Sequence, residues 1–135
     1  RSGRVTGVQT CALPILKLLI VDDAKLIHFL IKKILTANEI TDIEIKDAFN
    51  GNQAIDIVKE FQPDLVLLDV VMPERDGIET LRALKSDNPN IKVIMVSSLG
   101  TEAKVSEALS LGASAFIQKP FDEEELCALV KNAQA

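Results

Sequence analysis

The amino-acid sequence predicts an α/β fold, a doubly wound sheet of five parallel strands with five helices on both faces. Short apolar runs alternate with segments of helical periodicity along residues 16–135. Three runs, LLIV, LVLL and VIMV, are nearly continuous rather than alternating, as in parallel strands that are covered on both faces. A chain that repeats strand and helix in this way builds an open parallel sheet through right-handed crossovers.

The predicted strands are short and stand between residues that favour turns or helix ends. They span Leu16–Val21, Ile43–Phe49, Leu65–Val70, Ile91–Val96 and Ala115–Gln118. Periodicity alone does not give their order in the sheet.

The first predicted helix follows the first strand, and its apolar residues recur at helical spacing, which predicts one buried stripe. That stripe comprises Leu26, Ile27, Leu30, Ile31, Ile34 and Leu35. Lys25, Lys32 and Lys33 lie on or near the polar side of this helix. His28 stands alone on the polar side without acidic or basic partners nearby, and we interpret it as a surface residue.

Residues typical of helix ends bound the other four predicted helices. These signals are Asn50-Gly51 at the start of the second helix and Pro63 after its end, Asn88-Pro89 at the end of the third, Gly112 after the fourth, and the capping-box pair Asp122 and Glu125 at the start of the fifth. The apolar positions of the fourth helix are Ala103, Val105, Ala108, Leu109 and Leu111.

The first fifteen residues, RSGRVTGVQTCALPI, contain no acidic residue and no sustained helix or strand period. Residues 5–15, VTGVQTCALPI, resemble the translation of a common short-read sequencing adapter. We therefore expect residues 1–15 to be a non-native or disordered N-terminal arm, and residues 16–135 to form one domain. The alternative is a native arm that is poorly patterned.

The chain of 135 residues carries 15 basic and 20 acidic side chains, and residues 16–135 carry 13 and 20, a net charge of −7. This balance argues against binding to nucleic acid or to an anionic membrane. The apolar runs are far shorter than the roughly 20 residues of a membrane-spanning helix. Cys11 and Cys127 form no disulfide framework or zinc spacing, which fits a reducing cytosol and a cytoplasmic protein, and Cys127 is predicted to lie in the core.

Polar residues follow four of the predicted strands at the ends where the ligands of such sheets bind. They are Asp22 and Asp23 after the first strand, Asp69 in the third, Ser97 and Ser98 after the fourth, and Lys119 with Pro120 after the fifth. We expect three carboxylates, a hydroxyl and an ammonium group to converge at one edge of the sheet.

Clustered carboxylates repel one another unless a cation neutralises them, and a hard ion such as Mg²⁺ takes oxygen ligands. Asp69 could then accept a phosphoryl group, as carboxylates do in aspartyl-phosphate chemistry, with Lys119 and Ser97 stabilising its oxygens. Taken singly, Asp22 or Asp23 could instead cap the first helix, and Ser97 and Lys119 could be ordinary surface residues. Their joint occurrence favours a site.

Four motifs resemble the receiver domain of two-component response regulators, over essentially all of residues 16–135. These motifs are LLIVDD at Leu18–Asp23, PDLVLLDVVMPERDG at Pro63–Gly77, VIMVSS at Val93–Ser98 and GASAFIQKPF at Gly112–Phe121. The resemblance implies the flavodoxin-like (CheY-like) fold with strand order 2-1-3-4-5.

The resemblance also implies a phosphorylation-activated switch rather than a metabolic enzyme, one that catalyses only its own phosphorylation and autodephosphorylation. Asp69 matches the residue that accepts the phosphoryl group from a histidine kinase, and Lys119 matches the phosphate-pairing lysine. Ser97 and Phe116 match the switch hydroxyl and the switch aromatic residue. The expected Mg²⁺ ligands are Asp22, Asp23, Asp69 and the backbone carbonyl of Val71. The Lys119–Pro120 peptide bond is expected to be cis.

The sequence departs from the common family pattern at three positions. Phe116 stands where many members have Tyr, so this side chain can turn inward without losing a phenol hydrogen bond. Val71 and Leu99 stand where residues tune dephosphorylation, and both are apolar. We expect them to dry the approach of the attacking water and to give a long-lived phosphoryl-aspartate.

The expected partners are a histidine kinase and a downstream protein. We expect the kinase to dock near Asp69 and the first helix, with Lys25 and Lys32 as contacts, and the target to bind the fourth helix, fifth strand and fifth helix of a monomer. The SSLG at residues 97–100 and the single domain favour a stand-alone chemotaxis-type regulator. Alternatives are a phosphorelay intermediate, a receiver cut from a longer regulator, or a phosphorylation-independent pseudo-receiver.

Two other classes of protein fit less well. A haloacid-dehalogenase-type phosphatase also uses an Asp after an apolar strand, but it needs a second Asp where this chain has Val71. A flavodoxin-like flavin binder would want a Ser- and Thr-rich phosphate loop where Asp22 and Asp23 would repel phosphate.

Overall fold

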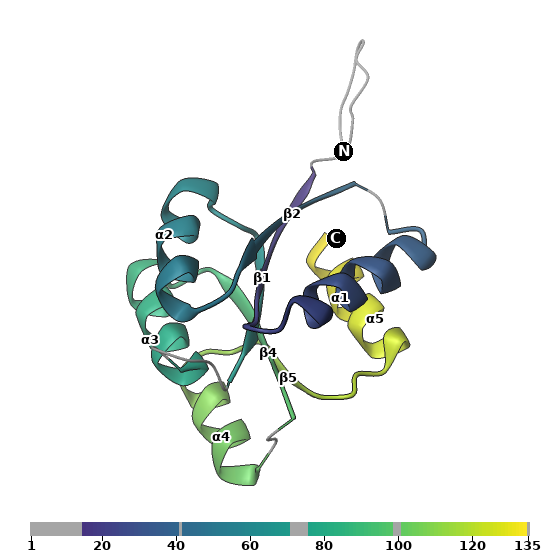
Figure 1. The fold of residues 1–135 in the computed structure, drawn as a ribbon. Helices are drawn as coiled ribbons and strands as arrows, with labels where there is room; N and C mark the ends of the chain where they lie inside the picture. The colour runs from purple at the N-terminus through teal and green to yellow at the C-terminus, as the bar shows by residue number, and fades with distance from the viewer. Residues whose placement is uncertain (1–14, 41, 71–75, 99–100, 135) are drawn as a thin grey trace.

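The computed structural model describes residues 15–40, 42–70, 76–98 and 101–134, and they form one sheet between two layers of helices (Figure 1). The strands are β1 (Leu16–Val21), β2 (Ile43–Ala48), β3 (Leu65–Asp69), β4 (Lys92–Ser97) and β5 (Ala115–Gln118). The helices are α1 (Lys25–Ala37), α2 (Gly51–Phe61), α3 (Gly77–Asp87), α4 (Glu102–Ser110) and α5 (Glu123–Gln134).

The five strands are parallel and lie in the order β2-β1-β3-β4-β5, which confirms the predicted fold. β1 lies between β2 and β3, so that Leu18 pairs with both Ile45 and Leu65. The ends of β1 and β3 therefore lie side by side at the carboxyl edge of the sheet. The bounds of β1 and β5 are as predicted, and the other strand ends differ by at most one residue, as at Ser97, which belongs to β4.

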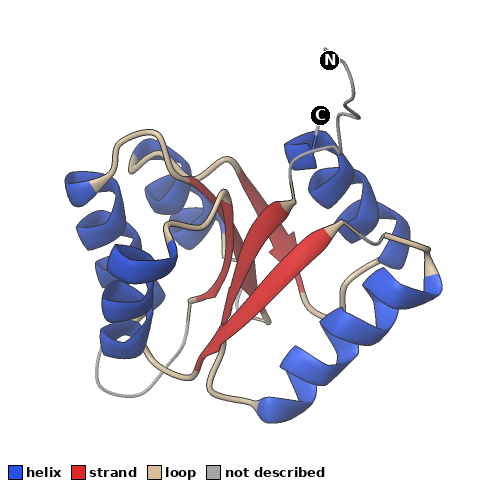
Figure 2. Cartoon of the chain, turned by 90° about the horizontal axis from the view of Figure 1, so that it is seen from above, coloured by secondary structure: helices blue, strands red, loops and turns tan. Residues whose placement is uncertain are grey.

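The core is divided by the sheet into two layers (Figure 2). In β1, Leu18 and Ile20 face the layer that contains α1 and α5, whereas Leu19 and Val21 face α2, α3 and α4. All four side chains are at most 1% exposed, and full burial of each such side chain contributes about 2 kcal/mol to folding. This two-sided burial explains why the central strands are continuously apolar.

The helices begin and end at most of the predicted signals. Asn50 caps α2 by accepting a hydrogen bond from the backbone N–H of Gln53 at 2.8 Å, and Gln62 ends it in the left-handed conformation. Asp122 accepts from the backbone N–H of Glu124 at 2.9 Å, at the start of α5. Gly112 has φ +103° after α4, a conformation that favours glycine.

The predicted stripe of α1 is partly wrong. Ile31 and Leu35 are buried, but Leu26 is 64% exposed, and His28, which was assigned to the polar side, is only 4% exposed. The spacing of apolar residues locates the buried face of a helix only to within one residue. A polar side chain can also point inward when it has hydrogen-bond partners there, as His28 has.

The predicted apolar face of α4 is also wrong in part, although Leu111, directly after the helix, packs against the core. Ala108 is buried, whereas Ala103 is exposed and Leu109 is 48% exposed. α4 therefore covers the sheet with a small residue and leaves apolar side chains in contact with solvent.

Cys127 lies in the α1 and α5 layer, as predicted, and burial raises the pKa of its thiol. Among the described residues, no helix is both long enough and apolar enough to cross a membrane. The expectation for residues 1–15 falls outside the described part of the chain except at Ile15, which is 57% exposed.

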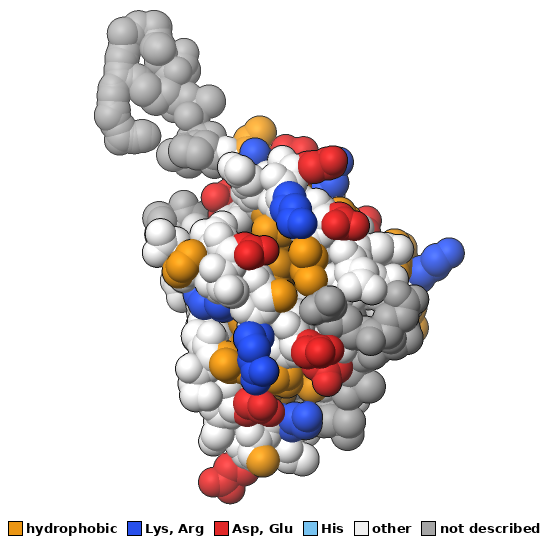
Figure 3. Space-filling view, turned by 90° about the vertical axis from the view of Figure 1, so that its left-hand side faces the viewer, with side chains coloured by type: hydrophobic (Ala, Val, Ile, Leu, Met, Phe, Trp, Pro, Cys, Tyr) orange, Lys and Arg blue, Asp and Glu red, His pale blue; other side chains and the backbone are white. Residues whose placement is uncertain are grey.

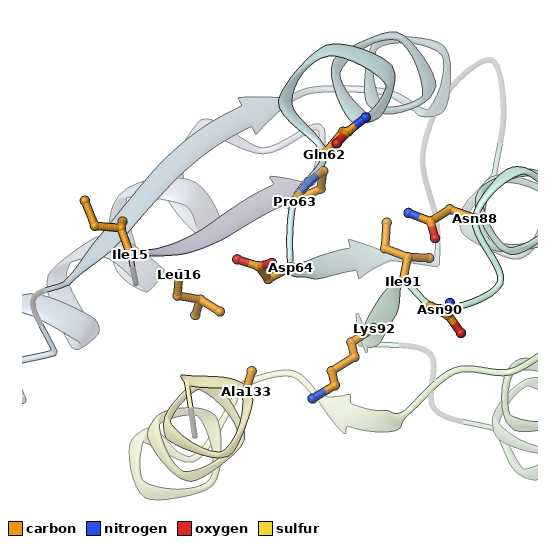
Figure 4. A pocket seen from close by; sticks show the side chains of 10 residues that line it. All are labelled: Ile15, Leu16, Gln62, Pro63, Asp64, Asn88, Asn90, Ile91, Lys92 and Ala133. Atoms are coloured by element: carbon orange, nitrogen blue, oxygen red, sulfur yellow. The ribbon is translucent and has the colours of Figure 1, made fainter. Parts of the chain in front are cut away.

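A polar pocket of about 480 Å³ lies at the amino ends of the strands (Figure 4). Asp64 precedes β3, Lys92 begins β4, and Leu16 begins β1. The predicted site residues lie at the carboxyl ends, so this pocket is at the opposite edge of the sheet from them.

Candidate functional site

Three aspartates meet at the carboxyl edge of the sheet, as predicted. Asp22 and Asp23 follow β1, Asp69 ends β3, and each offers a carboxylate oxygen within 4.8 Å of the other two. Asp22 is 3% exposed and Asp69 is 6% exposed, whereas Asp23 is exposed to solvent. Two buried carboxylates so close to a third need a compensating cation.

The backbone fixes Asp22 in this cluster. Its N–H donates to the carbonyl of Ala48 in the neighbouring strand at 3.1 Å, and its Oδ1 accepts from the N–H of Ala24 at 2.9 Å. The N-cap position of α1 is occupied by Ala24, whose side chain forms no cap hydrogen bond. The alternative that Asp22 or Asp23 caps the first helix is therefore wrong.

Lys119 brings a positive charge to the cluster from the end of β5. Its Nζ lies 2.7 Å from Oδ2 of Asp22 and 3.7 Å from Oδ2 of Asp69, and its side chain is 18% exposed. The backbone N–H of Lys119 donates to the carbonyl of Ser97 at 2.9 Å, and the Lys119–Pro120 peptide bond is cis, as expected. One ammonium group balances only part of the charge of three carboxylates.

The two predicted switch residues come from β4 and β5. Ser97 is fully buried at the end of β4, one residue beyond Val96, which pairs with Asp69. Phe116 is half-buried and packs in the layer of α2, α3 and α4, next to Met95 in the strand register. Both lie on the strands that follow Asp69 across the sheet.

Gly77 is a site residue that the sequence analysis gave no role. Its N–H donates to the carbonyl of Val70 at 2.7 Å, and a Cβ at this position would overlap the carbonyl oxygen of Asp69 and lie 2.6 Å from the Cα of Val70. The first turn of α3 thus packs directly against the backbone of Asp69. A glycine at a helix start shortly after a candidate nucleophile is the signal that could have identified it.

His28 is not a surface residue, and this prediction was wrong. Its ring lies 2.7 Å from two oxygens, with Nδ1 facing Oδ1 of Asp47 and Nε2 facing the backbone carbonyl of Asp22. Lys32 donates to Oδ2 of Asp47 at 2.8 Å. Asp47 comes from β2, next to β1, and its place near a carboxyl end could have identified it as a neighbour of Asp22.

The pKa of Asp47 is lowered from its ordinary value of 3.8. Burial would by itself raise this pKa, but the hydrogen bonds and charges of Lys32 and His28 outweigh that effect. Asp47 is therefore ionised at neutral pH, and its carboxylate binds both His28 and Lys32.

The residue types at this edge fit a divalent metal ion. Mg²⁺ is bound in proteins by one or two carboxylates and keeps several waters, and the exposed side of the cluster at Asp23 leaves room for them. Val71, the expected carbonyl ligand, and Leu99 lie outside the described residues.

Comparison of the sequence with known proteins matches the chain to one protein family. The family described as the response regulator receiver domain matches residues 18–131. The chemotaxis protein CheY of Listeria monocytogenes is 40% identical over 119 residues, which are 87% of this chain and 98% of that protein. The sporulation initiation phosphotransferase F of Bacillus subtilis is 40% identical over 115 residues, which are 85% of this chain and 90% of that protein.

Solved structures agree with these relatives. A CheY-like receiver domain protein from Methanospirillum hungatei matches with a TM-score of 0.81 and 28% identity, over 89% of this chain and 94% of that one. The receiver domain of a Francisella response regulator matches with a TM-score of 0.74 and 31% identity, over 87% of this chain and 95% of that one. The chain thus belongs to the receiver domains of two-component response regulators, signalling switches that accept phosphate from histidine kinases and act on downstream targets.

Proposed function

We propose that this chain is a phosphorylation-activated switch in which Asp69 accepts a phosphoryl group from a histidine kinase when Mg²⁺ is bound. The observation that carries the proposal is the cluster of Asp22, Asp23 and Asp69 with the ammonium group of Lys119. Asp22, Asp23 and Asp69 would hold the metal, with the carbonyl of Val71 as a further ligand by family resemblance. Mg²⁺ would neutralise charge on the phosphoryl oxygens.

In the transfer step, an oxygen of the Asp69 carboxylate attacks the phosphorus of the kinase phosphohistidine. The new O–P bond forms as the P–N bond breaks, and the imidazole leaves with the electron pair of that bond. Lys119 lies 3.7 Å from Asp69 and can pair with a phosphoryl oxygen there. The backbone contacts of Gly77 hold Asp69 in place for the attack.

The phosphoryl group adds negative charge and strong hydrogen-bond acceptors beside the end of β4. We propose that Ser97 moves toward these oxygens and that Phe116 turns into the space it leaves. The half-buried position of Phe116 supports this role, because a fully enclosed ring would have no second position. The result is a shift between two packings of β4, β5 and α4.

Phosphoryl uptake at Asp69 is the direct test of this function. Acetyl phosphate with Mg²⁺ should add about 80 Da, one HPO₃, to the intact chain in mass spectrometry. The Asp69→Asn variant should show no adduct, because the amide lacks the nucleophilic carboxylate. Asp56→Asn, a change of an exposed aspartate on α2, should behave as wild type. A wild-type chain without an Mg²⁺-dependent adduct would favour the pseudo-receiver alternative.

The phosphoryl group on Asp69 should be long-lived. Val71 and Leu99 are apolar and offer no group to orient the attacking water. The double variant Val71→Asn, Leu99→Glu should therefore lose its phosphoryl group several-fold faster than wild type, as measured by the decay of the adduct mass. Equal decay rates in the two proteins would contradict the role assigned to these side chains.

An apolar groove beside Lys119 supports docking of the kinase. It is lined by Ile27, Leu30 and Ile34 of α1 and by Pro120 and Phe121 after β5. A kinase helix placed there would bring its phosphohistidine to the carboxyl edge of the sheet. Of the two expected kinase contacts, Lys25 is exposed, whereas Lys32 is bound to Asp47 and is the weaker candidate.

The downstream target would bind α4, β5 and α5. The face made by α2, α3 and α4 carries basic and acidic side chains mixed together, with apolar side chains between them (Figure 3). On α4, Leu109 is 48% exposed and provides an apolar contact for a partner. The target-binding surface of α4, β5 and α5 would change when Phe116 repacks beneath it.

We favour a chemotaxis-type regulator, because the similarity to CheY of Listeria monocytogenes extends over 98% of that protein. A phosphorelay intermediate is the second candidate, since the sporulation initiation phosphotransferase F of Bacillus subtilis has the same 40% sequence identity to this chain as the Listeria CheY. The two differ in the fate of the phosphoryl group, which a relay passes to a second histidine and a chemotaxis regulator loses to water.

A further inference from the structure

We propose that His28 is a positioning residue for the metal site, an inference that rests on the proposed function. Its imidazole joins the backbone carbonyl of Asp22 to the carboxylate of Asp47, with both distances 2.7 Å. Through this link, β2 and α1 together hold the loop that carries the carboxylates of Asp22 and Asp23.

The two ring nitrogens of His28 face two different partners. A backbone carbonyl can only accept, so Nε2 donates to Asp22. Nδ1 faces Oδ1 of Asp47, also at 2.7 Å. The imidazole thus connects the loop after β1 to β2.

The other end of the link is itself fixed. Oδ2 of Asp47 accepts from Lys32 at 2.8 Å, and the His28 ring packs on Phe49 with a centroid distance of 4.5 Å. His28 cannot move far without breaking two short hydrogen bonds and this ring contact. The carbonyl of Asp22 is thereby tied to a rigid part of the fold.

The loop after β1 needs its backbone held in place, because only one of its two carboxylates is fixed by side-chain contacts. The Asp22 side chain is held by Ala24 and Lys119, but Asp23 is exposed and its position depends on the backbone that carries it. Residues that orient metal ligands from outside the coordination sphere typically change metal affinity 10–100-fold when they are removed. A leucine would fill the same volume, so core packing alone does not require histidine here.

The test is Mg²⁺ affinity of the full chain, measured by titration calorimetry, together with urea unfolding without metal. His28→Leu should weaken Mg²⁺ binding about tenfold, because it removes both hydrogen bonds. His28→Arg should restore most of the affinity, because a guanidinium group can donate to both acceptors. Lys33→Met, a change of an exposed lysine on α1, is the matched control and should bind Mg²⁺ as wild type, since it leaves His28, Asp47 and Lys32 in place.

A His28→Leu variant that is less stable without metal but binds Mg²⁺ as tightly as wild type would overturn the inference, since His28 would then be purely structural. If His28→Leu does not fold, His28→Gln replaces it, because its amide keeps one donor group and should show a smaller loss of Mg²⁺ affinity than is expected for leucine. His28→Arg should not show this loss. Equal Mg²⁺ affinity of wild type, His28→Gln and His28→Arg would again overturn the inference. A wild-type chain that binds no Mg²⁺ would overturn the proposed function as well, so the two failures are distinguishable.

Discussion

Replacing Gly77 with alanine is expected to lower the free energy of unfolding by about 3 kcal/mol and to abolish phosphoryl uptake at Asp69. The added Cβ would overlap the carbonyl oxygen of Asp69 and come within 2.6 Å of the Cα of Val70. These are backbone atoms of a buried strand end, so they cannot rotate away as a flexible side chain would. Either the first turn of α3 or the backbone of Asp69 must move.

Urea unfolding gives the loss of stability, and intact mass after treatment with acetyl phosphate and Mg²⁺ gives phosphoryl uptake. Gly112→Ala is a suitable control, because Gly112 has φ +103° and meets only the flexible side chain of Lys85 at 2.6 Å. This control should lose about 1–3 kcal/mol through backbone strain and still take up the phosphoryl group. Normal uptake by Gly77→Ala would show that the packing of α3 on Asp69 is unimportant.

Removing the charge of Lys119 should produce the second large effect. In Lys119→Met, the buried carboxylates of Asp22 and Asp69 lose the ammonium group at 2.7 and 3.7 Å. Removing one partner of a buried ion pair costs about 3–5 kcal/mol, a large share of the stability of a small domain. The variant should also fail to switch, because no lysine ammonium group remains beside Asp69 to pair with a phosphoryl oxygen.

Mg²⁺ distinguishes this explanation from a simple loss of packing. Any ligand that binds only the folded state stabilises it, and saturating Mg²⁺ should stabilise Lys119→Met more than wild type because no lysine competes for Asp22. The measurement is urea unfolding with and without Mg²⁺. Lys59→Met, a change of an exposed lysine on α2, should alter stability by less than about 0.5 kcal/mol. Equal Mg²⁺ stabilisation of wild type and Lys119→Met would contradict the electrostatic account.

Much of the fold could be predicted because β1, β3 and β4 are buried on both faces and therefore read as continuous apolar runs. The positions of Asp22, Asp69 and Lys119 at one edge followed from the rule that parallel strands end together. The resemblance then gave the strand order, which periodicity could not, since residues on different strands carry no signal of adjacency.

The errors have physical causes as well. Helical spacing assigns polar residues to the outer face, so it placed His28 in solvent and Leu26 in the core, whereas two hydrogen-bond acceptors hold His28 inside. One acceptor lies in the loop after β1 and the other in β2, and only the tertiary structure brings them together. Gly77 was missed for a similar reason, because its close approach to Asp69 becomes visible only when α3 packs on β3.

The division of the core by the sheet gives experimenters two independent reporter positions. Phe116 packs in the layer of α2, α3 and α4, whereas its neighbour Ile117 packs in the layer of α1 and α5. The chain contains no tryptophan, so a single engineered indole would fluoresce against a dark background. An indole on α4 would report the rearrangement of the output face, and an indole on α1 would report kinase docking, so that two single-indole variants could time the two events separately.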